Sequence, residues 1–311
     1  MKHELNIWVV GGDMRQAKLA QLLALDGHTV HTYALEQDRS TGPLPEEDLS
    51  QAEKADCVVL PLLVSTEGGL LNAPLSQTDH PLSDVLDALR PSQFICGGRL
   101  DSEILALAAH RGLTIRDYFA REELAVANAV PTAEGAIQLA MEHLPITIHG
   151  ARVLVVGFGR VGRLTAQRFQ ALGAKVSVAA RRYEQLAWAQ AMGLGTEHLA
   201  HLAGWLCGYD LIVNTVPAQV LGRLELEDVK EDCLILDLAS KPGGVDLRAA
   251  GELGLTVIWA LSLPGKVAPV TAGAAIKSTI YNMLQEAGYR EGRALEGSTR
   301  RTPARSASHS V

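Results

Sequence analysis

The sequence predicts an α/β protein with two Rossmann-like, doubly wound parallel-sheet domains, a cleft between them and connecting helices. The chain has 311 residues, which is too long for one ordinary core and suits two domains. Short β-branched runs alternate with longer helical patterns twice along the chain, and this alternation is typical of βαβ crossovers in parallel sheets. Aromatic residues make up 5% of the chain, so small aliphatic side chains can let helices lie close to each sheet.

Five strands are predicted in the first half of the chain. They cover residues 6–10, 29–33, 57–60, 94–96 and 114–116. Gly27 and Gly112 each follow a helical pattern and precede a strand, which is the usual position for the end of a helix. We therefore predict an N-terminal α/β domain over residues 1–127 that binds the substrate, completed by a returning helix over residues 271–288.

The second half repeats this scheme and predicts a Rossmann domain over residues 128–270. Its strands cover residues 152–156, 175–179, 211–214, 234–237 and 256–259. The stretch 118–144 is rich in alanine and glutamate and is interrupted by Pro131, so it predicts one connecting helix or a pair of helices. Residues 289–311 are rich in arginine, serine and threonine and lack apolar periodicity, which predicts a disordered tail.

Charge and cysteine content exclude several classes of protein. The net charge is -7, and basic residues are interspersed with acidic ones, so the chain lacks the basic stripe of a nucleic-acid binder. The four cysteines form no CxxC or Cys/His cluster, and Cys57, Cys96 and Cys233 adjoin apolar runs. We therefore expect core cysteines, no metal site and no disulfide framework. The sequence has no signal peptide and no run of about 18 apolar residues, so we expect a cytoplasmic protein without a membrane span.

The strongest motif is a strand, a glycine-rich turn and a helix start over residues 153–166. Gly157 permits the tight turn, Gly159 lets the backbone approach a pyrophosphate, and Gly162 lets helix and strand pack closely. We therefore predict a dinucleotide site at the N-terminus of this helix; the alternative is a Rossmann-like fold without a ligand. The predicted cofactor-binding residues are Gly157, Phe158, Gly159, Arg160, Val161, Gly162, Arg181, Arg182, Thr215, Val216 and Pro217.

Two arginines indicate which dinucleotide is bound. Arg181 and Arg182 end the second strand of this domain, where an NAD site would carry Asp or Glu. A carboxylate there binds the ribose 2′-hydroxyl, whereas guanidinium groups pair with a 2′-phosphate. NADP is therefore favoured over NAD. The alternative is that both arginines are solvated charges at the end of a strand.

The first half contains a counterpart turn over residues 9–16. Asp13 stands where a pyrophosphate would rest, and its charge would repel that group, so we expect no second dinucleotide there. Asp13 is predicted to cap the following helix. Arg15 is predicted either to bind an anionic substrate in the cleft or to form a surface ion pair.

Three loops follow strands of the second sheet, on the side where open α/β sheets bind ligands. They cover residues 214–217, 237–244 and 263–273. Lys241 and Lys266 place two cations in these loops, close to the expected nicotinamide. The alternative is that proline and glycine serve there only to turn the chain.

With these residues in view, the chain resembles the family of dipicolinate synthase A subunits found in spore-forming bacteria. The matching stretches are residues 11–16, 128–135, 157–162, 237–244 and 263–273. They span most of the chain as far as Gly288, and only the glycine fingerprint among them is generic. The resemblance implies an NADP-dependent oxidoreductase that converts dihydrodipicolinate to dipicolinate, a small dicarboxylate. It also implies a hetero-oligomer with a flavoprotein-like second subunit, the B subunit of dipicolinate synthase, in the mother cell during sporulation; we expect a homo-oligomer as well.

The implied substrate suggests roles for eight residues near the cleft. Cations that would neutralise its carboxylates are Lys241, Lys266 and Arg15. Neutral hydrogen bonds around the ring would come from Ser240, Thr132 and Asn128. Glu134 and Asp237 are the candidate proton acceptors of catalysis. Each has a structural alternative, because Glu134 could cap the connecting helix and Asp237 could only brace its loop.

Two other functions stay open at this point. One is a dehydrogenase of the 2-hydroxy-acid type, which commonly uses a histidine late in the chain as its acid and base. The sequence has no histidine between His201 and His309, which counts against this function. The other is a non-catalytic, NADP-binding regulatory subunit, which would form no NADPH with any substrate.

Overall fold

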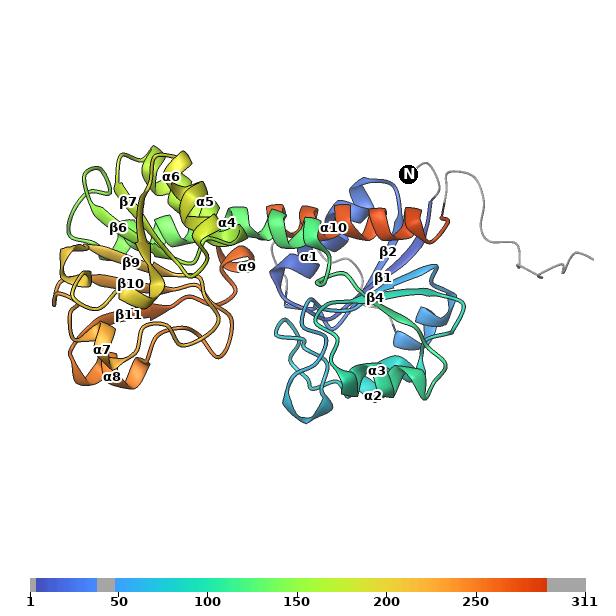
Figure 1. Cartoon of the computed structure of the whole chain (residues 1–311). Helices are drawn as coiled ribbons and strands as arrows, with labels where there is room; N and C mark the ends of the chain where they lie inside the picture. The colour runs from blue at the N-terminus through green and yellow to red at the C-terminus, as the bar shows by residue number, and fades with distance from the viewer. Residues whose placement is uncertain (1–3, 38–47, 290–311) are drawn as a thin grey trace, which may run out of the picture.

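The computed structural model describes residues 4–37 and 48–289, and it contains two α/β domains, each built on a parallel sheet (Figure 1). This architecture confirms the predicted fold class. The predicted disordered tail, apart from Tyr289, lies outside the described residues.

The N-terminal sheet has the strand order β2-β1-β3-β4-β5, and every pair is parallel. Its strands are β1 (Asn6–Val10), β2 (Thr29–Tyr33), β3 (Cys57–Val59), β4 (Phe94–Gly97) and β5 (Ile115–Asp117). The helices between them are α1 (Met14–Leu25), α2 (Leu82–Asp87), α3 (Ser102–Ala109) and the short 3-10 helices η1 (Leu49–Lys54) and η2 (Glu67–Gly69). All five predicted strands are present, and their ends differ from prediction by at most one residue.

The second sheet has the order β11-β10-β9-β6-β7-β8, again with parallel pairs only. Its strands are β6 (Arg152–Val156), β7 (Lys175–Ala180), β8 (Gly195–His198), β9 (Leu211–Asn214), β10 (Leu234–Asp237) and β11 (Thr256–Trp259). The helices are α5 (Arg160–Ala171), α6 (Tyr183–Ala191), α7 (Arg223–Leu226), α8 (Leu247–Glu252), α9 (Leu263–Val267), η3 (Leu199–His201) and η4 (Leu206–Gly208). The strand order reverses between β6 and β9, where doubly wound sheets bind ligands. Strand β8 was not predicted, because its polar, partly exposed sequence has no apolar run.

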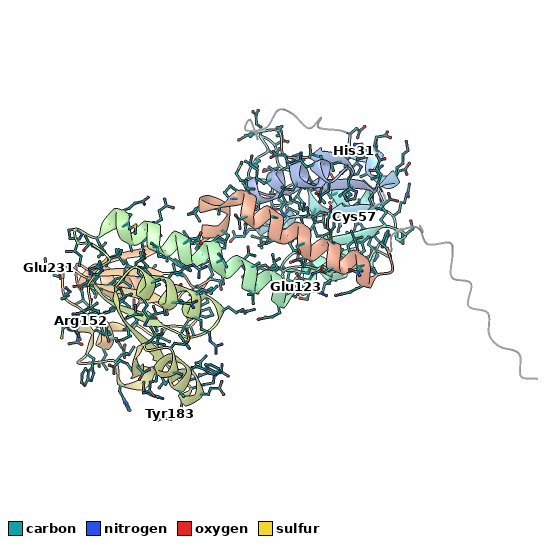
Figure 2. The ribbon with its side chains drawn as sticks, turned by 90° about the horizontal axis from the view of Figure 1, so that it is seen from above. His31, Cys57, Glu123, Arg152, Tyr183 and Glu231 are labelled. Carbon is teal, nitrogen blue, oxygen red and sulfur yellow. The ribbon has the colours of Figure 1, made fainter. Side chains whose placement is uncertain are left out.

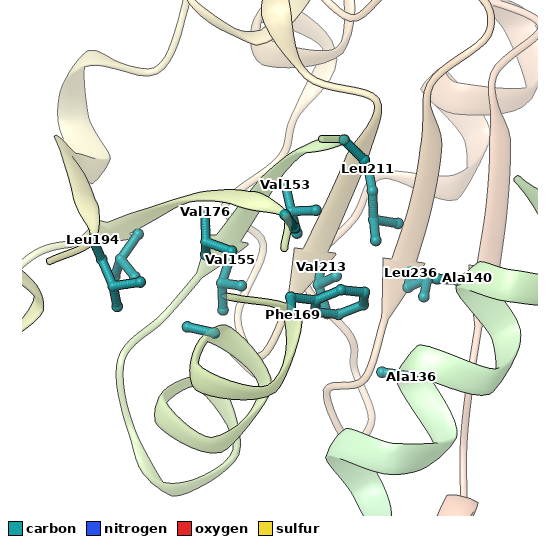
Figure 3. Packing of buried hydrophobic residues seen from close by; sticks show 14 of the residues in the cluster. Ala136, Ala140, Val153, Val155, Phe169, Val176, Leu194, Leu211, Val213 and Leu236 are labelled. Atoms are coloured by element: carbon teal, nitrogen blue, oxygen red, sulfur yellow. The ribbon is translucent and has the colours of Figure 1, made fainter. Parts of the chain in front are cut away.

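A single long helix, α4 (Glu122–His143), connects the domains and runs through Pro131 without a break. Of the two predicted arrangements, one helix or a helix pair, the structure has the first. Leu124 in its first turn belongs to the N-terminal core, whereas Ala136 and Ala140 lie in the core of the second domain beside Phe169 (Figure 3). The helix α4 therefore contributes side chains to the cores of both domains.

The last described helix, α10 (Pro269–Glu286), returns from the second domain and lies along α1 and α4 (Figure 2). Ile276, Ile280 and Leu284 are fully buried in the N-terminal core. At its end, Glu286 forms two hydrogen bonds of 2.7 Å with the Arg121 guanidinium just before α4. The helix therefore supplies one wall of the first domain, although it follows the second in sequence.

The cysteines expected in the core are found there, since Cys57, Cys96 and Cys233 are buried and unpaired. Within residues 4–37 and 48–289, no group of three or more His, Cys, Asp or Glu side chains could hold a metal ion. None of the helices in that part of the chain combines the length and apolar character needed to cross a membrane.

A hydrogen-bonded chain joins α10 to the N-terminal domain through His28. The Leu5 amide donates to His28 Nδ1 (3.2 Å), and His28 Nε2 lies 2.9 Å from the Tyr281 hydroxyl. That hydroxyl donates to Asp26, which also pairs with Lys277. Because Nδ1 accepts a hydrogen bond, the ring is neutral in this arrangement. Burial lowers the pKa of His28 below its ordinary value of 6.5, although the charge of Asp26 opposes the shift.

We expect protonation of His28 to destabilise the folded protein in mild acid. With the folded pKa of His28 lowered, the unfolded protein takes up a proton that the folded protein does not. The stability that neutral His28 contributes is therefore fully present above its ordinary pKa of 6.5, and it is lost as the pH falls toward the lowered pKa of the folded protein. Thermal denaturation of His28→Gln should show a flatter decline of Tm between about pH 7 and 5. The exposed His110 provides the control, since His110→Gln should keep the wild-type slope; an equal slope in both variants would contradict the assignment.

Candidate functional site

The glycine-rich turn between β6 and α5 has open space at one of its three glycines. Gly157 has φ +95°, and a Cβ there would lie 2.5 Å from Thr215 Oγ1. A Cβ at Gly162 would lie 2.1 Å from the Gly157 carbonyl oxygen, whereas a Cβ at Gly159 would meet no atom within 4 Å. No side chain caps the start of α5 at Gly159, so the backbone amides there can receive an anion. The geometry fits a pyrophosphate against Gly159.

A cavity of about 600 Å³ lies beside this turn, within the size range of cofactor sites. The predicted cofactor residues that line it are Gly157, Phe158, Gly159, Arg160, Val161, Arg181, Arg182, Thr215, Val216 and Pro217. Gly162 does not line the cavity; it packs against the backbone of the turn at Gly157. Further lining residues include Gln185, Leu199, Ala218 and Val220, and no sequence motif marked these four. Leu199 follows β8, so recognising that strand would have revealed it.

The three arginines at this cavity differ in their partners. Arg160 pairs with Glu122 at the start of α4 (2.7 Å), and Arg182 pairs with Glu184 (3.1 Å). Arg181 is exposed and has no ion-pair partner in the described part of the chain. Its carbonyl oxygen lies 3.1 Å from His198 Nε2, which ties the end of β7 to the end of β8. Arg181 is therefore the arginine whose charge is free for a ligand.

Asp237, at the end of β10, is nearly fully buried and already hydrogen-bonded. Its Oδ1 accepts from Asn214 Nδ2 (2.8 Å) and the Ala239 amide (3.0 Å), and its Oδ2 accepts from the Gly244 amide (2.7 Å). These bonds hold the loop after β10 in place. Ser240 and Lys241 lie exposed on that loop, so Asp237 fixes the backbone that carries them.

The two domains meet where α9 approaches the start of α1. A Cβ at Gly265 would lie 3.1 Å from Arg15 Nε and 3.4 Å from Asp13 Oδ2, and the exposed Lys266 is the next residue. Asp13 caps α1, as predicted, by accepting from the Arg15 amide. It also pairs with the Arg15 guanidinium at 2.6 Å. Burial raises the pKa of Asp13, but its hydrogen bonds and ion pair with Arg15 outweigh this and lower the pKa overall.

The predicted residues on α4 fall on different faces of the helix. Asn128 Oδ1 is buried without a hydrogen-bond partner, and Thr132 Oγ1 donates to the Asn128 carbonyl (2.7 Å). Glu134 lies 3.8 Å from Arg168 of α5 and is 58% exposed. It thus faces the second half of α5, about 12 Å along that helix from the cofactor turn. The structure brings Arg15 and Lys266 to one junction and places Glu134 apart from it.

These features define the class of protein. The chain has two α/β domains with parallel sheets, and the second domain holds the cavity beside the glycine-rich turn. Residues 115–239 match the family described as "D-isomer specific 2-hydroxyacid dehydrogenase, NAD binding domain". The protein is an oxidoreductase that uses a nicotinamide dinucleotide.

The comparisons also identify the family. Residues 6–119 match the model of the N-terminal domain of the dipicolinate synthase A subunit. The chain is 34% identical to the A subunit of dipicolinate synthase from Bacillus subtilis (strain 168), over 93% of this chain and 99% of the relative. The crystal structure of that A subunit superposes with a TM-score of 0.82, at 33% identity over 93% of this chain and 98% of that chain. The A subunit from Bacillus halodurans gives 0.82, at 30% identity over 90% and 97%. This chain belongs to the family of dipicolinate synthase A subunits, which confirms the resemblance seen in the sequence.

Proposed function

We propose that this protein oxidises dihydrodipicolinate to dipicolinate (pyridine-2,6-dicarboxylate) with NADP as the hydride acceptor. The name of the Bacillus subtilis relative, a dipicolinate synthase, supports the choice of substrate. The observation that carries the proposal is the contact of Gly265 with Arg15 and Asp13. It places the segment that carries Lys266 beside Arg15 of the other domain, and cations at this junction would bind the carboxylates of such a substrate.

The chain's own task in this reaction is to hold the substrate. Bound NADP would accept the hydride that the ring loses, and Glu134 or Asp237 would accept the accompanying proton. Lys241, Lys266 and Arg15 would bind the two carboxylates by charge-assisted hydrogen bonds. Neutral hydrogen bonds would come from Ser240, Thr132 and Asn128, and the unpartnered Asn128 Oδ1 has a free acceptor for this role.

The candidate proton acceptors are both engaged with other groups. Asp237 accepts three hydrogen bonds within its loop, and Glu134 faces Arg168. Formation of an aromatic ring supplies much of the driving force, so a strong base is less important than placement. The main catalytic contribution of the chain would therefore be positioning of the substrate and charge complementarity.

Preference for NADP over NAD is the part of the proposal that depends on Arg181. Replacing Arg181 with Asp should weaken NADP binding by about 1.5–3 kcal/mol, the usual worth of a hydrogen bond to a charged group, and weaken NAD binding much less. Arg182→Ala should have a smaller effect, because Arg182 already pairs with Glu184. Titration with each dinucleotide measures both. Arg248→Asp makes the same charge change on the exposed surface of α8 and serves as control; equal losses for NADP and NAD in Arg181→Asp would refute the assignment.

We further propose that the chain works as a homo-oligomer with a flavoprotein-like second subunit, in the cytoplasm of the mother cell during sporulation. The relative is itself named as one subunit of its enzyme, which supports a partner chain. Activity should therefore be measured with and without that partner.

Stoichiometric NADPH formation tests the proposed function. Purified protein is mixed with NADP and dihydrodipicolinate, with and without the second subunit, and NADPH and dipicolinate are quantified together. Equal amounts of the two products support the proposal. Tight NADP binding without NADPH formation in either mixture would instead identify a non-catalytic regulatory subunit.

A further inference from the structure

Arg99 lies in the loop after β4, on the edge of the N-terminal sheet that faces the cofactor domain. Two contacts establish which edge this is. After β1, Arg15 lies against Gly265 of α9. After β5, Glu122 pairs with Arg160 at the cofactor turn. Because β4 stands between β1 and β5 in a parallel sheet, its carboxyl end lies on this same edge, where α/β sheets bind ligands.

The backbone holds Arg99 in a conformation that arginine rarely adopts. Its φ is +54°, in the left-handed region that favours glycine. The Asp117 carboxylate fixes this conformation by accepting from the amides of Arg99 (3.2 Å) and Leu100 (3.1 Å). Beside it, Gly98 packs so closely that a Cβ would lie 2.4 Å from the Leu62 carbonyl oxygen. Backbone strain of this kind is retained chiefly at functional sites, and glycine at position 99 would relieve it.

The Arg99 side chain is exposed, and no carboxylate within the described ranges forms an ion pair with it. Arg15, on the same edge, is 11% exposed and already pairs with Asp13. Of the two arginines in these loops, Arg99 is therefore the one without an ion pair in the described part of the chain. A planar guanidinium with a free charge is suited to bidentate binding of a carboxylate.

We propose that Arg99 binds one carboxylate of the substrate from the N-terminal side of the cleft. This inference rests on the proposed function and adds a substrate-binding residue to it. The second carboxylate would be bound by Arg15 and by Lys241 and Lys266 of the cofactor domain. The hydrogen bonds to Asp117 fix the backbone that carries Arg99, so less backbone entropy is lost when the substrate binds.

Binding of pyridine-2,6-dicarboxylate to the full chain in the presence of NADP tests the proposal by calorimetry. Arg99→Ala removes the charge and keeps the strained backbone, whereas Arg99→Gly removes both. Each should weaken dicarboxylate binding by about tenfold or more, with NADP affinity within about twofold of wild type. Arg99→Gly should melt at or above the temperature of Arg99→Ala, because glycine suits the left-handed backbone. Arg90→Ala is the charge-matched control: this exposed arginine precedes β4 at the opposite edge of the sheet and pairs with Glu53.

The outcomes separate this proposal from the function on which it rests. If the wild-type chain does not bind the dicarboxylate, the proposed function and this inference both fail. If the wild type binds it and both Arg99 variants bind it equally well, only the role of Arg99 is refuted. A joint loss of NADP affinity and Tm in both variants would also refute it, because that pattern indicates a purely structural residue.

Discussion

Replacing Gly162 with alanine should abolish tight binding of the nicotinamide dinucleotide and destabilise the second domain. The new Cβ would lie 2.1 Å from the Gly157 carbonyl oxygen, far inside van der Waals contact. That oxygen belongs to rigid backbone, so the turn must move away from α5. Overpacking of this kind costs about 1–3 kcal/mol, and the displaced turn can no longer present the Gly159 backbone to a pyrophosphate. Dinucleotide titration and thermal denaturation measure the two effects.

Gly251 offers a matched control in the same domain. It lies exposed in α8, and a Cβ there would meet no atom within 4 Å. Gly251→Ala should therefore leave dinucleotide affinity unchanged and raise stability by about 0.5–1 kcal/mol, since alanine is the better helix residue. Wild-type dinucleotide affinity in Gly162→Ala would show that the close contact between turn and helix is not required for binding.

Replacing Lys266 with methionine should raise KM for the dicarboxylate by about tenfold or more, the scale of a lost charge-assisted hydrogen bond. NADP affinity should stay within about twofold, because a contact to the substrate alone is lost. Lys266 is exposed and follows Gly265, which lies against Arg15. Methionine keeps most of the length of the side chain and removes only the charge.

Steady-state kinetics and dinucleotide titration check this prediction. Lys175→Met serves as the control, because Lys175 begins β7 at the amino edge of the second sheet, away from the cleft, and its replacement should change neither constant. If Lys266→Met kept wild-type kinetics, or lost NADP affinity instead, the proposed location of the substrate would be wrong.

Local patterns explain why most of the fold could be predicted. A strand such as Leu211–Asn214 is a short apolar run that can be recognised from its own residues, and ten strands were predicted on that basis. Strand β8 was not predicted, because its residues are partly exposed at the edge of the sheet and carry no apolar pattern. Pro131 also misleads locally, since it lies inside a helix whose two ends are held by the cores of different domains.

The sequence by itself determined the two-domain fold, the dinucleotide turn and ten of the residues that line the cavity, because each depends on neighbours in the chain. Only the tertiary structure determined which polar side chains are already paired within the protein and which can contact a ligand. Asp237 and Asn214 are 23 residues apart, and their bond forms only once β9 and β10 pair. The contact of Gly265 with Arg15, and with it the placement of Lys266, likewise depends on α9 and α10 returning to the first domain. Partners of this kind are set by the packing of distant segments, which no local pattern of residues encodes.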